Sequence, residues 1–420
     1  MGWKRRLAAG AAGLVAVLAP GAAATETDAF VEPVDVLHTL SGTTPGAAYG
    51  WAVSELGDVD GDSKMDLVVG EPFTTGGTTY VYSGRTGALL YRLDGAPGDQ
   101  QGYAIADAGD TDGDGVPDIV SGAPGVGRGS AYLYSGATGR LLHTFSRGRN
   151  GDFFGAAVAG AGDVNRDGHA EVLVGAPLND GSGPDAGRAY VFSGRTYKLL
   201  RKLHAGDEGD FFGSATDWSA DLNADGRPEL IVGAQNGGPT TGGKTYVFSA
   251  RNGRTLFTMT PPASAVEFGS FFVAGVGDVN GDGTGDVYAA DYADGSLGPG
   301  TGRAAVHSGA DGTELQSWTG SEAGEGLGPG REAGDVDGDG LVDLAIGSYT
   351  SSDGAAQAGK VEIFSGVDGS LIRRITSTTP FENLGFDVVG VGDLSGDGIP
   401  DLLISAASGD RVYVVAGARE

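Results

Sequence analysis

Seven short acidic loops contain the residues of this sequence best suited to chemistry. The clearest loop runs from Asp335 to Asp343, with aspartates at loop positions 1, 3, 5 and 9 and glycine at position 6. Alternate carboxylates in a tight turn can point at one ion, and calcium takes about six to eight oxygen ligands. The glycine suits a turn that needs an unusual backbone conformation. This spacing predicts a calcium-binding loop in which position 7 adds its backbone carbonyl oxygen.

The same pattern occurs seven times in register, so ordinary turns rich in Asp and Gly are a poor explanation. Without a cation, carboxylates this close would repel one another. We predict five to seven bound Ca²⁺ ions. The predicted ligands, at positions 1, 3, 5, 7 and 9 of each loop, are Asp58, Asp60, Asp62, Lys64, Asp66; Asp110, Asp112, Asp114, Val116, Asp118; Asp163, Asn165, Asp167, His169, Glu171; Asp221, Asn223, Asp225, Arg227, Glu229; Asp278, Asn280, Asp282, Thr284, Asp286; Asp335, Asp337, Asp339, Leu341, Asp343; and Asp393, Ser395, Asp397, Ile399, Asp401.

The residues after each loop exclude an EF-hand, which has a Glu at position 12 and helices on both sides. Position 9 leads instead into apolar, β-branched sequence, as in residues 66–69 and 401–404. Sequence of this type favours strands. Each acidic loop is therefore predicted to join two β-strands.

The spacing of the loops predicts the fold. Their first residues stand 52, 53, 58, 57, 57 and 58 positions apart. Periods near 50 that contain several short strands indicate propeller blades. In the second repeat, residues 103–106, 119–120, 131–134 and 141–145 predict strands A, B, C and D, with the acidic loop between A and B and a Gly-containing turn between C and D. The sequence predicts an all-β, seven-bladed β-propeller of four-stranded blades.

The two ends of the chain predict how the ring closes. The last repeat has strands A, B and C at residues 386–390, 402–404 and 412–415, but no strand D. Residues 36–42 resemble a D strand and precede the first A strand. We expect this N-terminal strand to complete the seventh blade, because closure removes two open sheet edges. The predicted propeller spans residues 34–417, after a short linker at residues 25–33.

Two further repeated motifs carry a resemblance to a known family. The motifs are Phe154-Gly155, Phe212-Gly213 and Phe268-Gly269, and Gly122-Ala123-Pro124 and Gly175-Ala176-Pro177; residues 289–291, 347–349 and 405–407 lack the proline. The sequence resembles FG-GAP repeats, the blades of the integrin alpha-subunit propeller. The resemblance implies calcium in the acidic loops and a ligand on the opposite face. It implies the fold rather than receptor function, since the leg domains, membrane span and inserted metal-dependent domain of integrins have no counterpart in this sequence.

The N-terminus and the composition predict export. Residues 1–24 resemble a signal peptide, with a basic region at 4–6, an apolar run at 7–18 and a cleavage site near 22–24. The apolar run is short for a membrane span, and no later segment is a candidate. We expect an extracellular or periplasmic protein, exported by the general secretory or the twin-arginine route. The sequence has no Cys, so bound metal rather than disulfides would stabilise the exported fold. The net charge of −28 argues against nucleic acid as a partner, because its phosphates would be repelled.

The sequence contains no recognisable catalytic constellation, so an enzyme is not predicted. Residues 238–245 fit a phosphate-loop pattern, but strand-like sequence follows where a helix N-terminus would be needed. The acidic loops could supply acid pairs for glycoside cleavage. Carboxylates committed to a cation are poor proton donors, so a hydrolase or lyase is the lesser alternative. The tryptophans at 51, 218 and 318 are predicted to serve in packing.

The lengths of the loops predict which face binds a ligand. Antiparallel strands put the A–B loops and C–D turns on one face and the B–C and D–A loops on the other. The B–C loops are longest in blades three to six, at residues 179–187, 236–243, 291–302 and 348–359. Variable loops on a rigid scaffold usually carry binding. We predict a monomeric binding or adhesion module with a protein or glycan ligand on this second face. A lectin-like propeller is the alternative, although aromatic residues do not recur at equivalent loop positions.

Overall fold

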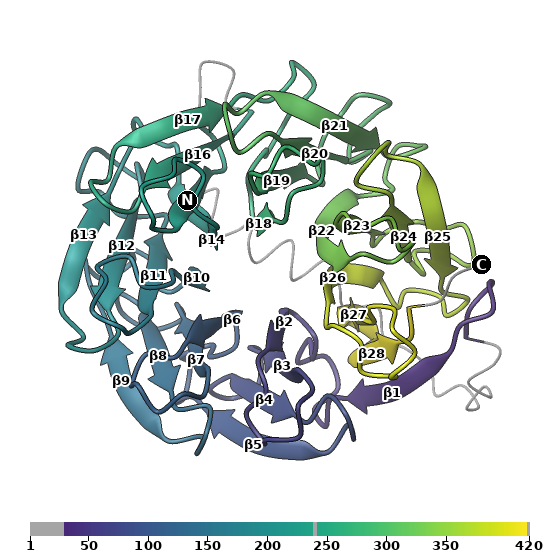
Figure 1. The fold of residues 1–420 in the computed structure, drawn as a ribbon, viewed down its shortest axis with the longest axis horizontal. Helices are drawn as coiled ribbons and strands as arrows, with labels where there is room; N and C mark the ends of the chain where they lie inside the picture. Colours follow the sequence, from purple (N-terminus) through teal and green to yellow (C-terminus); the bar gives the residue numbers. More distant parts are fainter. Residues whose placement is uncertain (1–28, 238–241, 418–420) are drawn as a thin grey trace.

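The molecule is a ring of seven four-stranded antiparallel sheets around a central axis (Figure 1). The computed structural model describes residues 29–237 and 242–417, so the predicted signal peptide lies outside the described residues. Each blade runs from an innermost A strand to an outermost D strand, and neighbouring strands pair in sequence order. The prediction of a seven-bladed all-β propeller is confirmed.

The strands follow the order A, B, C, D in every blade, and only the last blade draws on both ends of the chain. The bounds by blade are β2 (Val53–Leu56), β3 (Asp66–Glu71), β4 (Thr78–Tyr82), β5 (Leu89–Asp94); β6 (Ala104–Gly109), β7 (Asp118–Ala123), β8 (Ser130–Tyr134), β9 (Leu141–Phe145); β10 (Ala157–Gly160), β11 (Glu171–Ala176), β12 (Arg188–Ser193), β13 (Leu199–Leu203); β14 (Phe212–Ser219), β15 (Glu229–Ala234), β16 (Lys244–Ser249), β17 (Thr255–Met259); β18 (Val273–Val276), β19 (Asp286–Asp291), β20 (Arg303–His307), β21 (Glu314–Thr319); β22 (Leu327–Gly334), β23 (Asp343–Ser348), β24 (Lys360–Phe364), β25 (Leu371–Thr376); and β26 (Leu384–Gly390), β27 (Leu402–Ala406), β28 (Arg411–Val415), β1 (Val36–Ser41). A short 3₁₀ turn, η2 (Ala407–Gly409), joins β27 to β28.

The ring closes as the sequence predicts. Strand β1 pairs antiparallel with β28, with Leu40 opposite Val412, and supplies the D strand of the seventh blade. The residues before β1 also contact the propeller. The Phe30 ring packs against Tyr413 with centroids 5.4 Å apart, and the Glu32 carboxylate accepts a hydrogen bond from the Thr376 amide at 2.7 Å. The described end of the predicted linker is therefore packed onto the last two blades.

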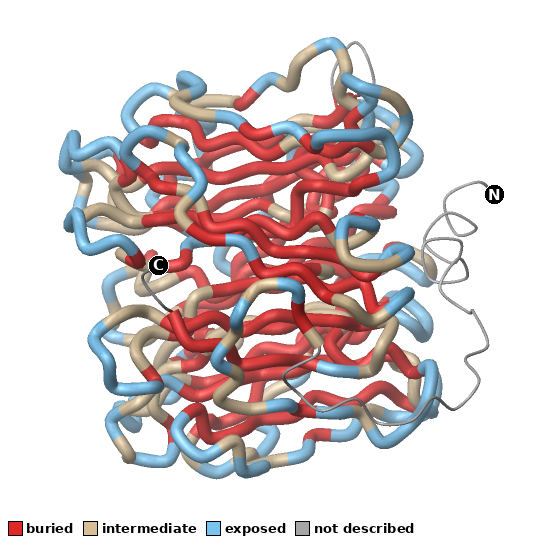
Figure 2. The backbone as a smooth tube through the Cα atoms, turned by 90° about the vertical axis from the view of Figure 1, so that its right-hand side faces the viewer, coloured by how far each residue is buried: buried red, intermediate tan, exposed pale blue. Residues whose placement is uncertain are grey.

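The hydrophobic core lies between the blades. Every B strand has all of its residues buried, because blades stack against both of its faces. The outermost strands are more exposed, and β5 buries only Leu93. Figure 2 shows this arrangement, with buried strands inside and exposed loops at both ends. Apolar clusters such as the one that joins β11 to β15 bridge neighbouring blades and hold the ring together.

The two halves of the repeated motif meet in one contact between neighbouring blades. A β-carbon added at Gly175 would lie 2.1 Å from the carbonyl oxygen of Gly213, and one at Gly122 would lie 2.0 Å from that of Gly155. Gly213 and Gly155 have φ angles of +89° and +88°, which side chains disfavour. Glycine is thus required on both sides, where the backbones of adjacent blades touch.

Candidate metal and ligand sites

Each acidic loop is folded by its own carboxylates. In the loop between β22 and β23, the Asp335 carboxylate accepts hydrogen bonds from the amides of Gly338 at 2.6 Å and Gly340 at 3.0 Å. Asp337 accepts the Asp339 amide at 3.0 Å. Such turns, in which an Asp side chain bonds an amide a few residues on, form readily in short loops. They turn the carboxylates at positions 1, 3 and 5 toward one another.

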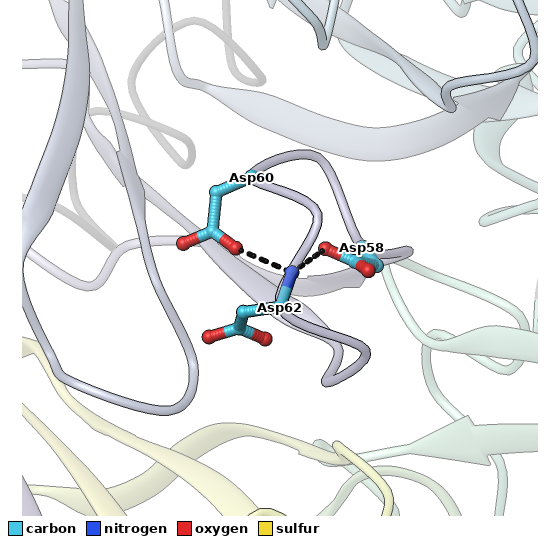
Figure 3. Close-up of side chains that lie close together, drawn as sticks. All are labelled: Asp58, Asp60 and Asp62. Carbon is cyan, nitrogen blue, oxygen red and sulfur yellow. Dashed lines mark hydrogen bonds between the residues drawn. The ribbon is translucent and has the colours of Figure 1, made fainter.

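Five of the seven loops bring three acidic side chains within 4.8 Å of one another. Figure 3 shows one of them, in which the Asp62 amide donates to the carboxylates of both Asp58 and Asp60 at 3.1 Å. The clusters are Asp58, Asp60, Asp62; Asp110, Asp112, Asp118; Asp163, Asp167, Glu171; Asp221, Asp225, Glu229; and Asp335, Asp337, Asp339. Hard oxygen donors at this separation fit calcium, which would offset their mutual repulsion.

The remaining two loops are less convergent. Among the described residues, the loops that begin at Asp278 and Asp393 form no such group of three acids. The second has Ser395 at position 3, whose hydroxyl contacts the Asp393 carboxylate at 3.3 Å, whereas the Asn280 of the first occupies the same position as Asn in two of the convergent loops. The acid clusters are compatible with calcium in five loops, and the carbonyl ligands predicted at position 7 stay a prediction.

The carboxylate at position 9 also has a structural role, which the sequence did not predict. Asp343 is fully buried at the start of β23. Its Oδ2 accepts the Val336 amide at 2.7 Å, and its Oδ1 accepts the Gly366 amide of the C–D turn at 3.1 Å. This carboxylate therefore ties the acidic loop to the turn beside it. The loops at Asp66, Asp118, Asp286 and Asp401 repeat the same pair of bonds.

Burial sets the proton affinity of these position 9 groups. It raises the pKa of Asp343 to about 6, with the charge of Asp337 adding to the rise. Burial likewise raises the pKa of Glu229 to about 7 and that of Glu171 to about 8. A carboxylate with such a pKa is only partly ionised near neutral pH, so a bound divalent cation would favour its ionised form.

The acidic loops contact one another around the ring. A β-carbon at Gly57, just before the first loop, would lie 2.6 Å from Cγ of Pro117 at position 8 of the second loop. At six of the seven junctions between adjacent loops, the residue just before one loop is a glycine, and it faces a larger side chain at position 8 of the next loop. The pairs are Gly57–Pro117, Gly109–Ala170, Gly162–Pro228, Gly277–Val342, Gly334–Pro400 and Gly392–Met65. At the remaining junction the sizes are exchanged, with Ala220 facing Gly285. The seven loops thus form one continuous ring of contacts.

Side chains of the loops strengthen this ring at several junctions. Arg166 donates from Nη2 to the carbonyl oxygens of Asp225 at 2.7 Å and Gly226 at 2.8 Å in the next loop. His169 Nδ1 lies 2.9 Å from the Thr111 carbonyl oxygen of the preceding loop. The side chain at position 7, as in His169, therefore contacts a neighbouring loop rather than its own cluster.

Comparison with known proteins agrees with this geometry. The family model described as FG-GAP repeat matches residues 154–192 and 332–364, and that described as FG-GAP-like repeat matches residues 58–121 and 221–289. The chain contains FG-GAP repeats. The matched stretches of these FG-GAP repeats include six of the seven acidic loops, all except the one that begins at Asp393.

Integrin alpha subunits are among the relatives found. The FG-GAP propeller is 32% identical to integrin alpha pat-2 of Caenorhabditis briggsae over 45% of this chain, and 33% identical to integrin alpha-3 of Cricetulus griseus over 33%. These matches span 18% and 15% of the relatives' own lengths. A solved structure entitled "Crystal structure of BBS1N in complex with ARL6DN, soaked with mercury" superimposes with a TM-score of 0.60 at 12% identity, covering 92% of this chain and 97% of that one, and shows the fold alone.

The face opposite the acidic loops opens into the central channel of the FG-GAP propeller. The channel holds a cavity of about 570 Å³. Six aromatic side chains form a continuous rim at its B–C and D–A end, with ring centroids 5.2 to 6.5 Å apart; in order they are Tyr103, Trp51, Phe386, Tyr349, Tyr292 and Phe271. The sequence analysis missed this rim, because its members come from different strands and loops of five blades.

Charged groups line the channel below the rim. Arg331 lies 3.3 Å from the Asp387 carboxylate and donates to the Val53 carbonyl oxygen at 3.1 Å. Asp107 and Asp217 accept amides of neighbouring blades, from Gly57 at 3.1 Å and Gly275 at 3.0 Å. Glu55 also lines the cavity, so carboxylates outnumber the guanidinium of Arg331 among the described lining residues. The channel is therefore lined mainly by acidic groups below the aromatic rim.

The structure settles two smaller predictions from the sequence. The phosphate-loop pattern runs into strand β16, which begins at Lys244, and not into a helix, while residues 238–241 of the pattern lie outside the described residues. Trp318 packs as predicted, against Phe364 with centroids 5.3 Å apart. For Trp218 the packing prediction is wrong, since this side chain is 41% exposed at the acidic-loop end of the channel. In the part of the chain that is described, no helix is long and apolar enough to cross a membrane.

Proposed function

We propose that the protein is an exported, calcium-stabilised FG-GAP propeller that binds a protein ligand with its B–C and D–A loop face, as an adhesion or recognition module. The observation that carries the proposal is that the two faces of the propeller differ in their loops and side chains. One face is occupied by the ring of acidic loops, whose carboxylates fit calcium. The other presents long loops around the aromatic rim of the channel.

The aromatic rim supports protein binding on that face. Aromatic side chains contribute large contact areas at interfaces and bind cationic groups on their faces. The carboxylates of Glu55, Asp107 and Asp217 lie deeper in the same cavity and would favour a basic side chain of a partner. Calcium would act at a distance from the ligand by stabilising the scaffold that holds the loops.

A binding array of extracellular-matrix proteins and glycans, run with calcium and with chelator, tests the proposal. We expect a protein ligand to be captured in calcium, and its capture to fall in chelator. Tyr349→Ala, at the rim, should weaken the capture, whereas the matched variant Trp218→Ala, at the other end of the channel, should not. Capture of glycans alone would favour the lectin-like alternative. Capture that depends on Trp218 and not on Tyr349 would place the ligand on the wrong face and refute the proposal.

A further inference from the structure

A second cavity, of about 360 Å³, lies on the same face in blade three. It opens between the B–C loop of that blade and the D–A loop that joins β9 to β10. Four basic side chains line it, Arg147, Arg149, Arg188 and Lys202. The chain as a whole carries a net charge of −28, so a cluster of four basic side chains is opposite in sign to most of the molecule. We call this cavity the blade-three pocket.

The basic groups of the blade-three pocket form no ion pair in the described part of the molecule. Arg188 donates to the Ser182 hydroxyl at 3.4 Å, but its Nε is a buried donor without an acceptor. A buried donor on a charged group is costly to leave unpaired. An anionic ligand would supply the missing acceptor.

The acids closest to the pocket are already engaged. Asp152 is buried and accepts hydrogen bonds from the Arg149 amide at 2.7 Å and from the Asn179 side chain. Asp180, which lines the pocket, accepts the Asp185 amide at 3.0 Å. Their oxygens organise the two loops, and in the described part of the chain neither acid forms an ion pair with the four basic side chains.

Blade six provides an internal comparison. Its B–C loop closes with the same hydrogen bond, from the Gly359 amide to the Ser351 carbonyl oxygen at 3.0 Å, as that from Gly187 to Asn179 in blade three. Arg188 therefore corresponds to Lys360, the residue after this closing glycine. The Lys360 amine is neutralised by Glu325 at 2.7 Å and by Asp353 at 2.8 Å.

The acids of blade six are replaced in blade three. The position of Asp353, two residues after the closing carbonyl, is Gly181 in blade three. Glu362 of blade six, which pairs with Arg374 at 2.6 Å, corresponds to Tyr190, which lies opposite Lys202. Blade three has kept the basic side chains of this constellation and lost two of its acids. The same fold thus builds a cluster of paired charges in one blade and an open, mostly basic pocket in the other.

We propose that the blade-three pocket binds the carboxylate of an acidic side chain on a protein partner. Arginine presents planar donors that match a carboxylate, often through two bonds. The pocket has room for about one side chain or one sugar unit, and the rest of the acidic surface would repel a long polyanion such as a sulfated polysaccharide. The proposal rests on the proposed function, since it names the chemistry of the partner that this face would bind.

Equilibrium binding of a fluorescent, acetylated and amidated Glu-Glu-Glu peptide to the full chain in calcium tests the proposal. We expect saturable binding at one site, and weakening by roughly tenfold or more in Arg147→Gln/Arg149→Gln. The matched control Arg251→Gln/Arg254→Gln removes the same charge from exposed residues at a C–D turn on the opposite face, and should bind as the parent does. Melting curves verify that both variants remain folded.

Three outcomes overturn the proposal. One is the absence of saturable binding to the peptide, and another is equal weakening in the two double variants. The third is that a glucuronate-containing tetrasaccharide binds in an Arg147- and Arg149-dependent manner while the peptide does not, which would assign the pocket to acidic glycans. If the array still captures a protein whose binding ignores both arginines, the proposed function stands and only this inference fails.

Discussion

Asp343→Asn separates the two roles that the structure gives to the position 9 carboxylates. In the parent, both oxygens of the buried Asp343 accept backbone amides, from Val336 on one side and Gly366 on the other. Asparagine can keep one of these bonds, but its NH₂ group then faces the second amide. The variant should therefore be destabilised even when no calcium is available. Asp337→Asn is the matched control, because Asp337 is exposed and asparagine retains the oxygen that accepts the Asp339 amide.

The magnitude follows from the bonds that are lost. A hydrogen bond to a charged group contributes about 1.5–3 kcal/mol, and a buried donor left unpaired costs about 1–3 kcal/mol. We expect Asp343→Asn to lower the free energy of unfolding by about 2–3 kcal/mol in excess chelator. Asp337→Asn should stay within about 0.5 kcal/mol of the parent there, as exposed substitutions usually do. In calcium both variants lose a ligand, and each site contributes roughly 2.7 kcal/mol at a hundredfold excess over Kd.

Denaturant unfolding of the parent and both variants, in calcium and in chelator, measures these differences. The expected pattern is that Asp337→Asn is destabilised only in calcium, whereas Asp343→Asn is destabilised in both conditions. If the two variants were equally stable in chelator, the carboxylate at position 9 would have no structural role apart from binding the ion. If neither lost stability relative to the parent in calcium, this loop would not bind the ion.

Three more predictions address the metal content, the ring closure and the channel. Metal analysis after dialysis should find five to seven calcium ions per chain, and two or fewer would refute the assignment of the loops. Deleting residues 34–41 should cause a cooperative loss of stability or solubility, because it removes the partner of β28 and the buried Leu40; a monomeric product with the parent's melting curve would contradict the closed ring. Burial raises the pKa of Glu55 to about 7, against the opposing charge of Arg331 and with Asp107 and Asp217 adding to the rise. The folded protein then binds more protons than the unfolded chain, so the contribution of Glu55 to stability is lost as pH rises from about 4 to 7. Glu55→Gln should gain stability relative to the parent between pH 5 and 8 in denaturant unfolding, and a difference independent of pH would count against this reasoning.

The fold could be predicted from the sequence because its signals are local and repeated. Each acidic loop is a short segment whose residues contact one another, and its period of 52 to 58 residues reports the blade. The D strand at residues 36–41 was recognisable because it resembles its counterparts and because the last repeat lacks one. Repetition turned weak individual patterns into a strong one.

The channel and the blade-three pocket could not be predicted in this way, since each depends on residues that are far apart in the chain. The aromatic rim is assembled from Trp51, Tyr292, Phe386 and their neighbours, which occupy different places in their repeats. In the blade-three pocket, the informative signal is a departure from the repeat, namely Gly181 and Tyr190 where blade six has acids. A repeat-by-repeat comparison of charge at equivalent positions would have detected this departure.

The junction between Ala220 and Gly285 shows that the acidic loops are fitted to one another as well as to a cation. At the other six junctions a glycine faces a larger side chain, and here alone the small residue has moved to the opposite side, where a β-carbon added at Gly285 would lie 3.7 Å from the Ala220 β-carbon. Two independent calcium loops would place no such constraint on residues that bind no ion. Close packing across the junction means that ordering one loop restricts its neighbour, because packed interiors tolerate little displacement. The ring of loops therefore acts as a single closure of this face, and each bound cation would stabilise the two blades beside it together with its own.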